Sequence, residues 1–416
     1  MRPPARRTAR LLYGAGLAAA LVLPAAAPAR AAPVPRTPTA DGAKGQELPG
    51  MPTSLDARAE AVACTPASSE KAKKQDWSRQ RLDLDRLHRH TTGAGVTVAL
   101  ISTGVDSGAE GLDGRVTAEG EAADDCVGQG TFLAGLIAGT GGKTPRLAGV
   151  APGAKILALR GTDRRGQPDP ALVTAAVRAA TTADADVIAV AVALPRKETA
   201  LSRAVAEARR AGAVVVAAAG PEAPPRGQAD EIPSRTYWPA GEPGVLAVAD
   251  MLPAGTRPDG ALPAGGVDLA APGAGVVSGG PRGKGHYLGG GVAVATAYAA
   301  GAAAAVRAAH PDEPADAVTR RLTATAYPAD IPQLDAYAAV TTVLGASGAP
   351  AGGAERAAEP VAVRDTSDTD RATGRALLFV LLGSAGVLSL LWAGFALSRA
   401  RARGWRPAGS GTGAEG

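Results

Sequence analysis

Hydroxyl, imidazole and carboxylate side chains are the groups from which a hydrolytic site is built, and imidazoles are scarce in this chain. Hydrolysis by a serine nucleophile needs a hydroxyl, an imidazole that takes its proton, and a carboxylate that orients the imidazole. The sequence of 416 residues contains four histidines, which are His88, His90, His286 and His310. None of them stands at a predicted helix start after a Gly-x-Gly turn, so we interpret each as a surface or structural residue.

Six glycine-containing segments nevertheless have the form of a catalytic framework. Four of them are VALISTGVD at 98–106, GQGTFLAGLIA at 128–138, VVVAAAG at 214–220 and GVAVATAYAAG at 291–301. The other two are GVAPGA at 149–154 and VDLAAPG at 267–273. In order and spacing these segments resemble the subtilisin-like serine proteases of peptidase family S8, and among them the mycosins, the membrane-anchored proteases of type VII secretion systems. The resemblance covers residues 77–345.

The resemblance implies that the catalytic groups of the family have been replaced. The family pattern Asp-Thr-Gly places the carboxylate at Ser102, and the pattern Gly-His-Gly-Thr places the imidazole at Gln129. The nucleophile of the pattern Gly-Thr-Ser corresponds to Ala293, and the oxyanion-binding asparagine after Ala-Ala-Gly corresponds to Pro221. An alanine methyl cannot attack a carbonyl, a neutral amide is no base near pH 7, and proline lacks a backbone N–H. We therefore predict a pseudoprotease, with an active serine endopeptidase that uses other groups as the alternative.

Both ends of the chain predict export and membrane attachment. Residues 1–31 combine a basic start, an apolar run at 11–23 and the cleavage pattern Ala29-Arg30-Ala31, as in a secretory signal peptide. Residues 376–397 carry no charge and, as a helix of about 33 Å, are long enough to cross a bilayer. Arginines follow in the tail, 398–416, which predicts a cytoplasmic C-terminus and an ectodomain outside the cell membrane.

The part between these ends divides into three sections. Residues 32–76 are rich in proline, alanine and polar residues, and we expect this N-terminal extension to wrap the domain surface. In 77–345, runs with strand spacing alternate with runs of helical spacing, which predicts a subtilisin-like α/β domain with a mostly parallel sheet flanked by helices. Residues 346–375 read as a flexible stalk. The formal net charge of +5 comes from the arginines at the two ends, so the mildly acidic remainder gives no indication of nucleic-acid binding.

The predicted elements of the central section follow one another in the order expected for βαβ units. Strands are predicted at 95–101, 155–159, 186–193, 213–219 and 245–249, and helices at 130–139, 170–182, 199–211, 293–309 and 315–324.

Cys64 and Cys126 are the two cysteines of the chain. In an exported protein an even pair predicts a disulfide, which would join the extension to the segment around Gln129.

The sequence contains no metal-ligand spacing and no phosphate-binding loop, and we predict neither a metal nor a cofactor. The predicted function is a non-catalytic scaffold, regulator or peptide-binding subunit. The resemblance implies a type VII secretion membrane complex as partner, and an extended peptide of a secreted protein is a second candidate.

Overall fold

The computed structural model describes residues 48–56, 61, 63–142, 147–222, 235–258, 261, 265–345 and 367–404. These residues belong to two compact units, one within 1–350 and one within 351–416, and each is described by itself. The predicted signal peptide, 1–31, lies outside the described residues, as do most of the predicted stalk and most of the predicted tail.

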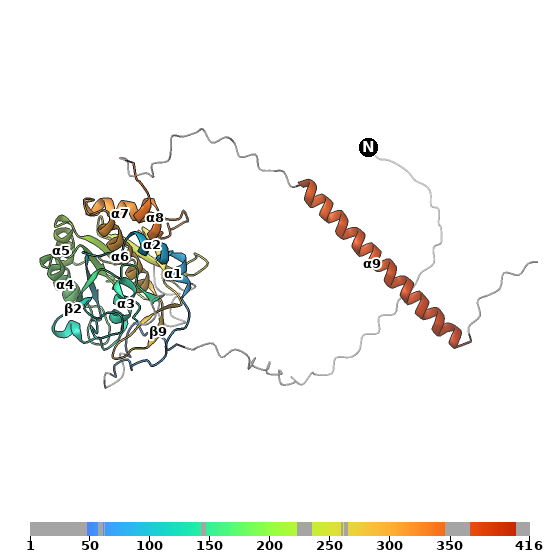
Figure 1. The fold of residues 1–416 in the computed structure, drawn as a ribbon, viewed down its shortest axis with the longest axis horizontal. Coiled ribbons are helices and arrows are strands. Elements are labelled where there is room, and N and C mark those ends of the chain that lie inside the picture. Colours follow the sequence, from blue (N-terminus) through green and yellow to red (C-terminus); the bar gives the residue numbers. More distant parts are fainter. Residues whose placement is uncertain are drawn as a thin grey trace, which may run out of the picture. The chain divides into compact units, whose positions relative to one another are not determined.

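A seven-stranded parallel sheet forms the centre of the first unit (Figure 1). In spatial order its strands are β2 (Val116–Ala118), β3 (Lys155–Arg160), β1 (Thr97–Ser102), β4 (Val187–Val190), β5 (Val214–Ala218), β6 (Leu246–Met251) and β7 (Leu269–Pro272). The central strands are continuous apolar runs because helices cover both faces of the sheet. This arrangement confirms the predicted α/β fold with a mostly parallel sheet.

Helices surround this sheet in the first unit (Figure 1). In chain order they are α1 (Trp77–Arg81), α2 (Leu84–His90), the 3-10 helix η1 (Gly120–Ala123), α3 (Gln129–Ala138), α4 (Pro170–Thr182), α5 (Thr199–Arg210), α6 (Val292–Ala309), α7 (Ala315–Ala324) and α8 (Ala336–Thr341). Helices α4 and α7 occupy the ranges predicted from the sequence, α5 and α6 differ from their predicted ranges by one residue at one end, and α3 begins and ends one residue earlier than predicted.

Alternate side chains of β1 enter two separate cores, one on each face of the sheet. Val98 and Leu100 pack in the core that contains the buried residues of α3 and α6. Ala99 and Ile101 pack in the core that contains the buried residues of α4 and α5. The period of two along the strand therefore assigns α3 and α6 to the same face. The N-termini of these two helices carry Gln129 and Ala293.

An antiparallel pair, β8 (Val276–Gly279) with β9 (His286–Gly289), lies outside the main sheet and is not predicted from the sequence. The described part of the N-terminal extension runs along β9. The N–H of Met51 donates to the carbonyl of Leu288 at 2.8 Å, and the N–H of Leu288 donates to the carbonyl of Pro49 at 2.9 Å. Further along, the N–H of Leu55 donates to the carbonyl of Arg165 at 2.8 Å. The extension is therefore attached to the domain by backbone pairing.

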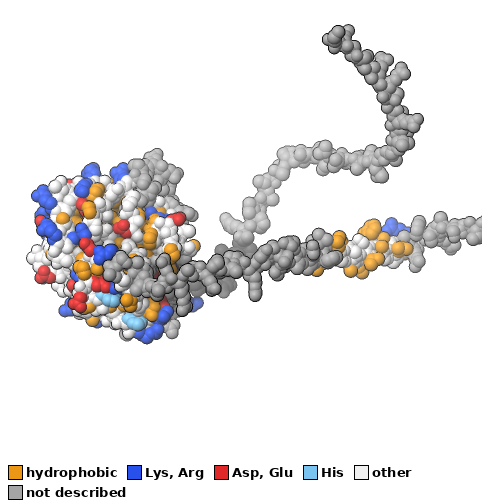
Figure 2. Space-filling view, turned by 90° about the horizontal axis from the view of Figure 1, so that it is seen from above, with side chains coloured by type: hydrophobic (Ala, Val, Ile, Leu, Met, Phe, Trp, Pro, Cys, Tyr) orange, Lys and Arg blue, Asp and Glu red, His pale blue; other side chains and the backbone are white. Residues whose placement is uncertain are grey.

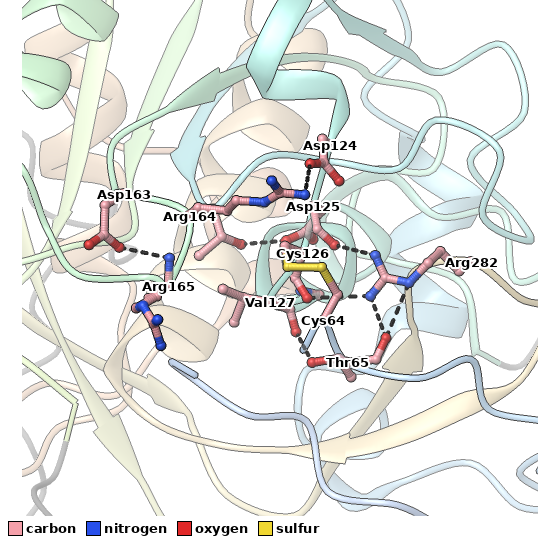
Figure 3. The surroundings of a disulfide bond; sticks show 12 residues. Cys64, Thr65, Asp124, Asp125, Cys126, Val127, Asp163, Arg164, Arg165 and Arg282 are labelled. Atoms are coloured by element: carbon pink, nitrogen blue, oxygen red, sulfur yellow. Dashed lines mark hydrogen bonds and ion pairs between the residues drawn. A yellow bond between two sulfur atoms is a disulfide. The ribbon is translucent and has the colours of Figure 1, made fainter. Parts of the chain in front are cut away.

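A disulfide joins Cys64 to Cys126 and links the extension to the loop before α3 (Figure 3). The carbonyl groups of Thr65, Asp125 and Cys126 all accept hydrogen bonds from the guanidinium of Arg282. The hydroxyl of Thr65 also donates to the carbonyl of Val127. The guanidinium therefore fastens both sides of the disulfide to the β8–β9 connection (Figure 3).

Removal of this cross-link is expected to destabilise the protein. The bridge closes a loop with a sequence separation of 62, and the double variant Cys64→Ser/Cys126→Ser should lose roughly 2–4 kcal/mol of unfolding free energy. Chemical denaturation of both proteins under oxidising conditions measures the difference. Equal midpoints would contradict the expectation, and reduced wild-type protein, which should behave like the variant, is the control.

The second unit contains one long helix, α9 (Ser367–Ala402). Its large apolar side chains from Val380 to Leu397 are exposed where they are described, and hydrophobic side chains with basic ones beyond them are visible in Figure 2. The helix begins inside the predicted stalk, 346–375, and extends beyond the predicted span, 376–397, at both ends. Two helices in the described part of the chain are long and apolar enough to cross a bilayer. They are α6, which is 83% buried, and Leu382–Arg399 within α9, which is 0% buried.

Candidate active site

The positions predicted to be catalytic lie at the carboxyl edge of the parallel sheet and at two helix N-termini. Ser102 is the last residue of β1, Gln129 is the first of α3, and Ala293 is the second of α6. Pro221 follows β5 after a short turn. The carboxyl edge is where α/β proteins usually place their ligand sites.

Three of these four residues line one cavity of about 430 Å³. Its walls come from the extension, the loop after β3, the segment after β4, the segment after β5 and the N-termini of α3 and α6. The lining residues are Thr53, Ser54, Gln129, Gly166, Gln167, Pro168, Ala191, Val192, Ala193, Ala218, Gly220, Pro221, Glu222 and Ala293. Ser102 is not among them and is only 1% exposed. The structure thus brings together Gln129, Pro221 and Ala293, and it places Ser102 behind the cavity wall.

Glu222 is the residue of this cavity that the sequence analysis misses. Its Oε1 accepts hydrogen bonds from the Nε2 of Gln129 at 3.3 Å and from the backbone N–H of Ala293 at 3.1 Å. Its Oε2 lies so close to Gly291 that a Cβ there would come within 1.7 Å of it. The carboxylate therefore occupies the N-terminus of α6, where a helix favours a negative charge. The only signal in the sequence is an acidic residue directly after Pro221.

The carboxyl of Glu222 lies in surroundings that disfavour its charge. Burial raises its pKa to about 7, and the negative charge of Asp250 acts in the same direction. Hydrogen bonds from the backbone of Ala293 and Val292 and from Gln129 oppose this shift. Burial is the larger effect, so the carboxyl changes its protonation state near neutral pH.

Asp125 organises the other helix N-terminus from a position three residues before Gly128. One carboxylate oxygen accepts from the Thr103 hydroxyl at 2.8 Å and from the N–H of Gly128 at 2.7 Å. The other accepts from the N–H and the hydroxyl of Thr131, at 2.8 and 2.7 Å. Glycine at the N-cap has no side chain that could make these bonds. Asp125 therefore caps α3 and ties its start to the end of β1.

Ser102 has no partner in this network. Its hydroxyl oxygen is buried without a hydrogen bond among the described residues. It faces Gly130, where a Cβ would come within 2.5 Å of it. The hydroxyl has no base to activate it and no imidazole to orient. A serine at this position also lacks the negative charge with which a carboxylate would stabilise an imidazolium.

The four histidines have structural contacts and none lines the cavity. The Nε2 of His88 lies 3.0 Å from the carbonyl of Gly149, and that of His310 lies 2.8 Å from the carbonyl of Val340. The Nδ1 of His286 accepts from the N–H of Ala72 at 2.9 Å. The ring centroid of His90 lies 5.5 Å from that of Tyr337. No group of His, Cys, Asp and Glu side chains suited to a metal ion occurs in the part of the chain that the structure describes.

The pH dependence of stability tests the position of Glu222. Because the folded protein holds a proton that unfolded chains release near pH 4.5, stability should fall as pH rises from about 5 to about 7. Glu222→Gln removes this contribution and should gain roughly 2 kcal/mol over wild type between pH 5 and pH 8. Denaturation curves of both proteins at each pH measure it. Parallel pH profiles would show that the carboxyl is not desolvated in this way.

The comparisons with known proteins agree with this geometry. Residues 93–360 match the subtilase family, peptidase S8. Mycosin-3 of Mycobacterium tuberculosis is 31% identical over 383 residues, covering 74% of this chain and 81% of the relative, and Mycosin-1 of the same organism is 31% identical with coverage of 74% and 80%. The solved MycP3 protease from the type VII (ESX-3) secretion system superposes with a TM-score of 0.58 at 27% identity, over 71% of this chain and 97% of that one. MycP1 from Mycobacterium smegmatis superposes with a TM-score of 0.58 at 27% identity, over 72% of this chain and 93% of that one. These similarities confirm the resemblance to subtilases and mycosins.

Proposed function

Because the chain belongs to the subtilase family, we propose that it is a membrane-anchored, non-catalytic subunit that acts with a type VII secretion system. The similarity to mycosins supports the association with secretion. The Glu222 carboxylate, which occupies the carboxyl edge of the sheet at the predicted catalytic positions, supports the loss of protease activity. Gln129 and Ala293 stand at the family positions of base and nucleophile, and both donate to Glu222. The Glu222 carboxylate stands where a substrate oxyanion would accept the N–H of residue 293. The site therefore keeps the fold of a subtilase and does not catalyse peptide hydrolysis.

Co-purification tests the association. The full-length chain, extracted from its native membrane with a mild detergent and captured through a C-terminal tag, is expected to bring down membrane components of a type VII system. The control is a chain whose residues 376–397 are replaced by an unrelated spanning helix, which should capture the same components if the ectodomain makes the contact. Recovery of the chain alone from both would count against the association.

The proposed topology places the subtilase domain outside the cell membrane and the C-terminus in the cytoplasm. Helix α9 carries the apolar run, and arginines follow it in the sequence. A reporter fused after Gly416 is therefore expected to be active only if it requires the cytoplasm. A reporter that works only outside the membrane would reverse this orientation.

Peptide binding is a second candidate function, which the surviving cavity favours. Ala191, Val192 and Ala193 continue from β4 along its wall. An extended peptide can add to such a segment through main-chain hydrogen bonds. The subunit would then hold a segment of a secreted protein without cutting it. Saturable binding of peptides to the purified full-length chain, with no loss of intact peptide, is the result expected.

A further inference from the structure

We propose that His286 is an acid-sensitive latch: its neutral imidazole holds residues 66–75 of the N-terminal extension, the strap, against β9, and protonation of the imidazole releases them. The strap lies between two fixed points of the chain. Before it, the disulfide joins Cys64 to Cys126, and after it, α1 begins at Trp77. The inference goes beyond the proposed function and does not depend on it.

His286 holds the strap through both its backbone and its side chain. Its N–H donates to the carbonyl of Glu70 at 2.7 Å. The N–H of Ala72 donates in turn to the Nδ1 of the His286 imidazole at 2.9 Å. In regular strand pairing a main-chain carbonyl would accept this second bond, and here the ring nitrogen replaces it. Nδ1 can accept a hydrogen bond only when it carries no proton, so this contact requires the neutral imidazole.

The second hydrogen bond is shielded from water at both ends. His286 is 6% exposed and Ala72 is 9% exposed. Protonation of Nδ1 turns the acceptor into a donor that faces the N–H of Ala72. Two donors cannot share a bond, so both N–H groups would be left buried without an acceptor as long as the strap stays in place. Movement of the strap away from β9 lets water solvate both groups.

The charges around the imidazole set the direction of the pH dependence. Burial lowers the pKa of His286 below its ordinary value of 6.5, and the positive charges of Lys71 in the strap and Arg79 in α1 act in the same direction. Glu110, between β1 and β2, opposes them and is itself paired with Lys71. Because the closed state lowers this pKa, it is fully favoured above about pH 6.5 and loses its advantage as pH falls below that value.

Release would move the strap as a loop and leave the extension attached. The disulfide holds the chain before the strap, and the buried ion pair of Asp76 with Arg79 holds it directly afterwards. The outer edge of β9 would then expose the N–H of His286, which the carbonyl of Glu70 covers in the closed state. Acidification is thus coupled to the exposure of a strand edge.

Hydrogen exchange measured by mass spectrometry on the full-length protein in detergent tests the latch. Labelling at about pH 7.5 and at about pH 5, corrected for the intrinsic pH dependence of exchange, compares the protection of strap amides with that of β1. We expect protection of the strap to fall by at least about 10-fold at the lower pH while β1 stays protected. Equal protection of the strap at both pH values would overturn the proposal.

Three variants assign the response to the imidazole. In His286→Asn the side-chain oxygen can accept the same bond and does not titrate, so the strap should stay protected at both pH values. Gly285→Ala should leave the strap unprotected at both, because a Cβ there would come within 2.2 Å of the carbonyl oxygen of Ser68. His90→Asn changes an exposed histidine and should keep the wild-type response. An acid response that survives in His286→Asn would assign it to another group and contradict the proposal.

Discussion

The triple variant Ser102→Asp/Gln129→His/Ala293→Ser is expected to react only weakly with a serine-directed fluorophosphonate, although it restores the residue types of a catalytic triad. The backbone N–H of residue 293, which should stabilise the oxyanion, already donates to Glu222 at 3.1 Å. A histidine at 129 would lie beside the same carboxylate, which would raise the pKa of the imidazole and so lower the fraction of it that can accept a proton near pH 7.

Removal of the two remaining obstacles should raise this reactivity. Addition of Pro221→Asn and Glu222→Ala to the triple variant supplies an oxyanion donor and frees the N–H of residue 293. An oxyanion donor contributes about 10²–10³ in rate. The variant with all five substitutions should therefore label at least about 100 times faster than the triple variant. Ala293→Ser alone is the control and should not label, because its hydroxyl has no base. Equal labelling rates of the triple variant and the variant with all five substitutions would show that Glu222 does not block the site. Mass spectrometry of the intact protein measures the labelled fraction over time.

Asp125→Ala is expected to destabilise the fold by roughly 3–5 kcal/mol. The side chain is 2% exposed and accepts four hydrogen bonds from Thr103, Gly128 and Thr131. Its removal leaves buried donors at the start of α3 and the end of β1 without an acceptor, and each such group costs about 1–3 kcal/mol. The stated loss is below the sum because water can enter part of the space.

The matched control for this substitution is Asp113→Ala, which removes an exposed aspartate and should change stability by less than about 0.5 kcal/mol. Guanidinium denaturation of the two variants and wild type gives the comparison. If Asp125→Ala unfolds with wild-type stability, the network around α3 does not hold the helix in place.

The central strands and long helices follow from apolar periodicity, and the structure places them close to the predicted ranges. The pattern works for β1 and α4 because each buries a face that local spacing reveals. It fails for α1, a five-residue helix whose position depends on distant groups. Arg79, 1% exposed, pairs with Asp76 and donates to the carbonyls of Leu147, at 2.8 Å, and Val277, at 2.9 Å. Such long-range polar contacts leave no periodic signal in the sequence.

The candidate site was predictable in its positions and not in its contents. Motif order located Gln129 and Ala293, and the structure places both in one cavity with Pro221. The role of Glu222 depends on how the turn after β5 folds against the N-terminus of α6, a contact between residues 71 positions apart. The separation of Ser102 from the cavity likewise depends on its packing against Gly130. Side-chain placement of this kind is set by tertiary structure rather than by residue type.

Reaction of the wild-type protein with a fluorophosphonate decides whether the site retains serine-protease chemistry, which the proposed function excludes. In subtilisin itself, a member of the same family, removal of the triad lowers kcat by about 2 × 10⁶. Wild-type full-length protein, purified in detergent and incubated with the probe and with a mixed peptide substrate, is expected to gain no adduct mass and to leave the peptides intact. Formation of an adduct on a single residue, together with peptide cleavage that the probe abolishes, would contradict this account and identify the nucleophile.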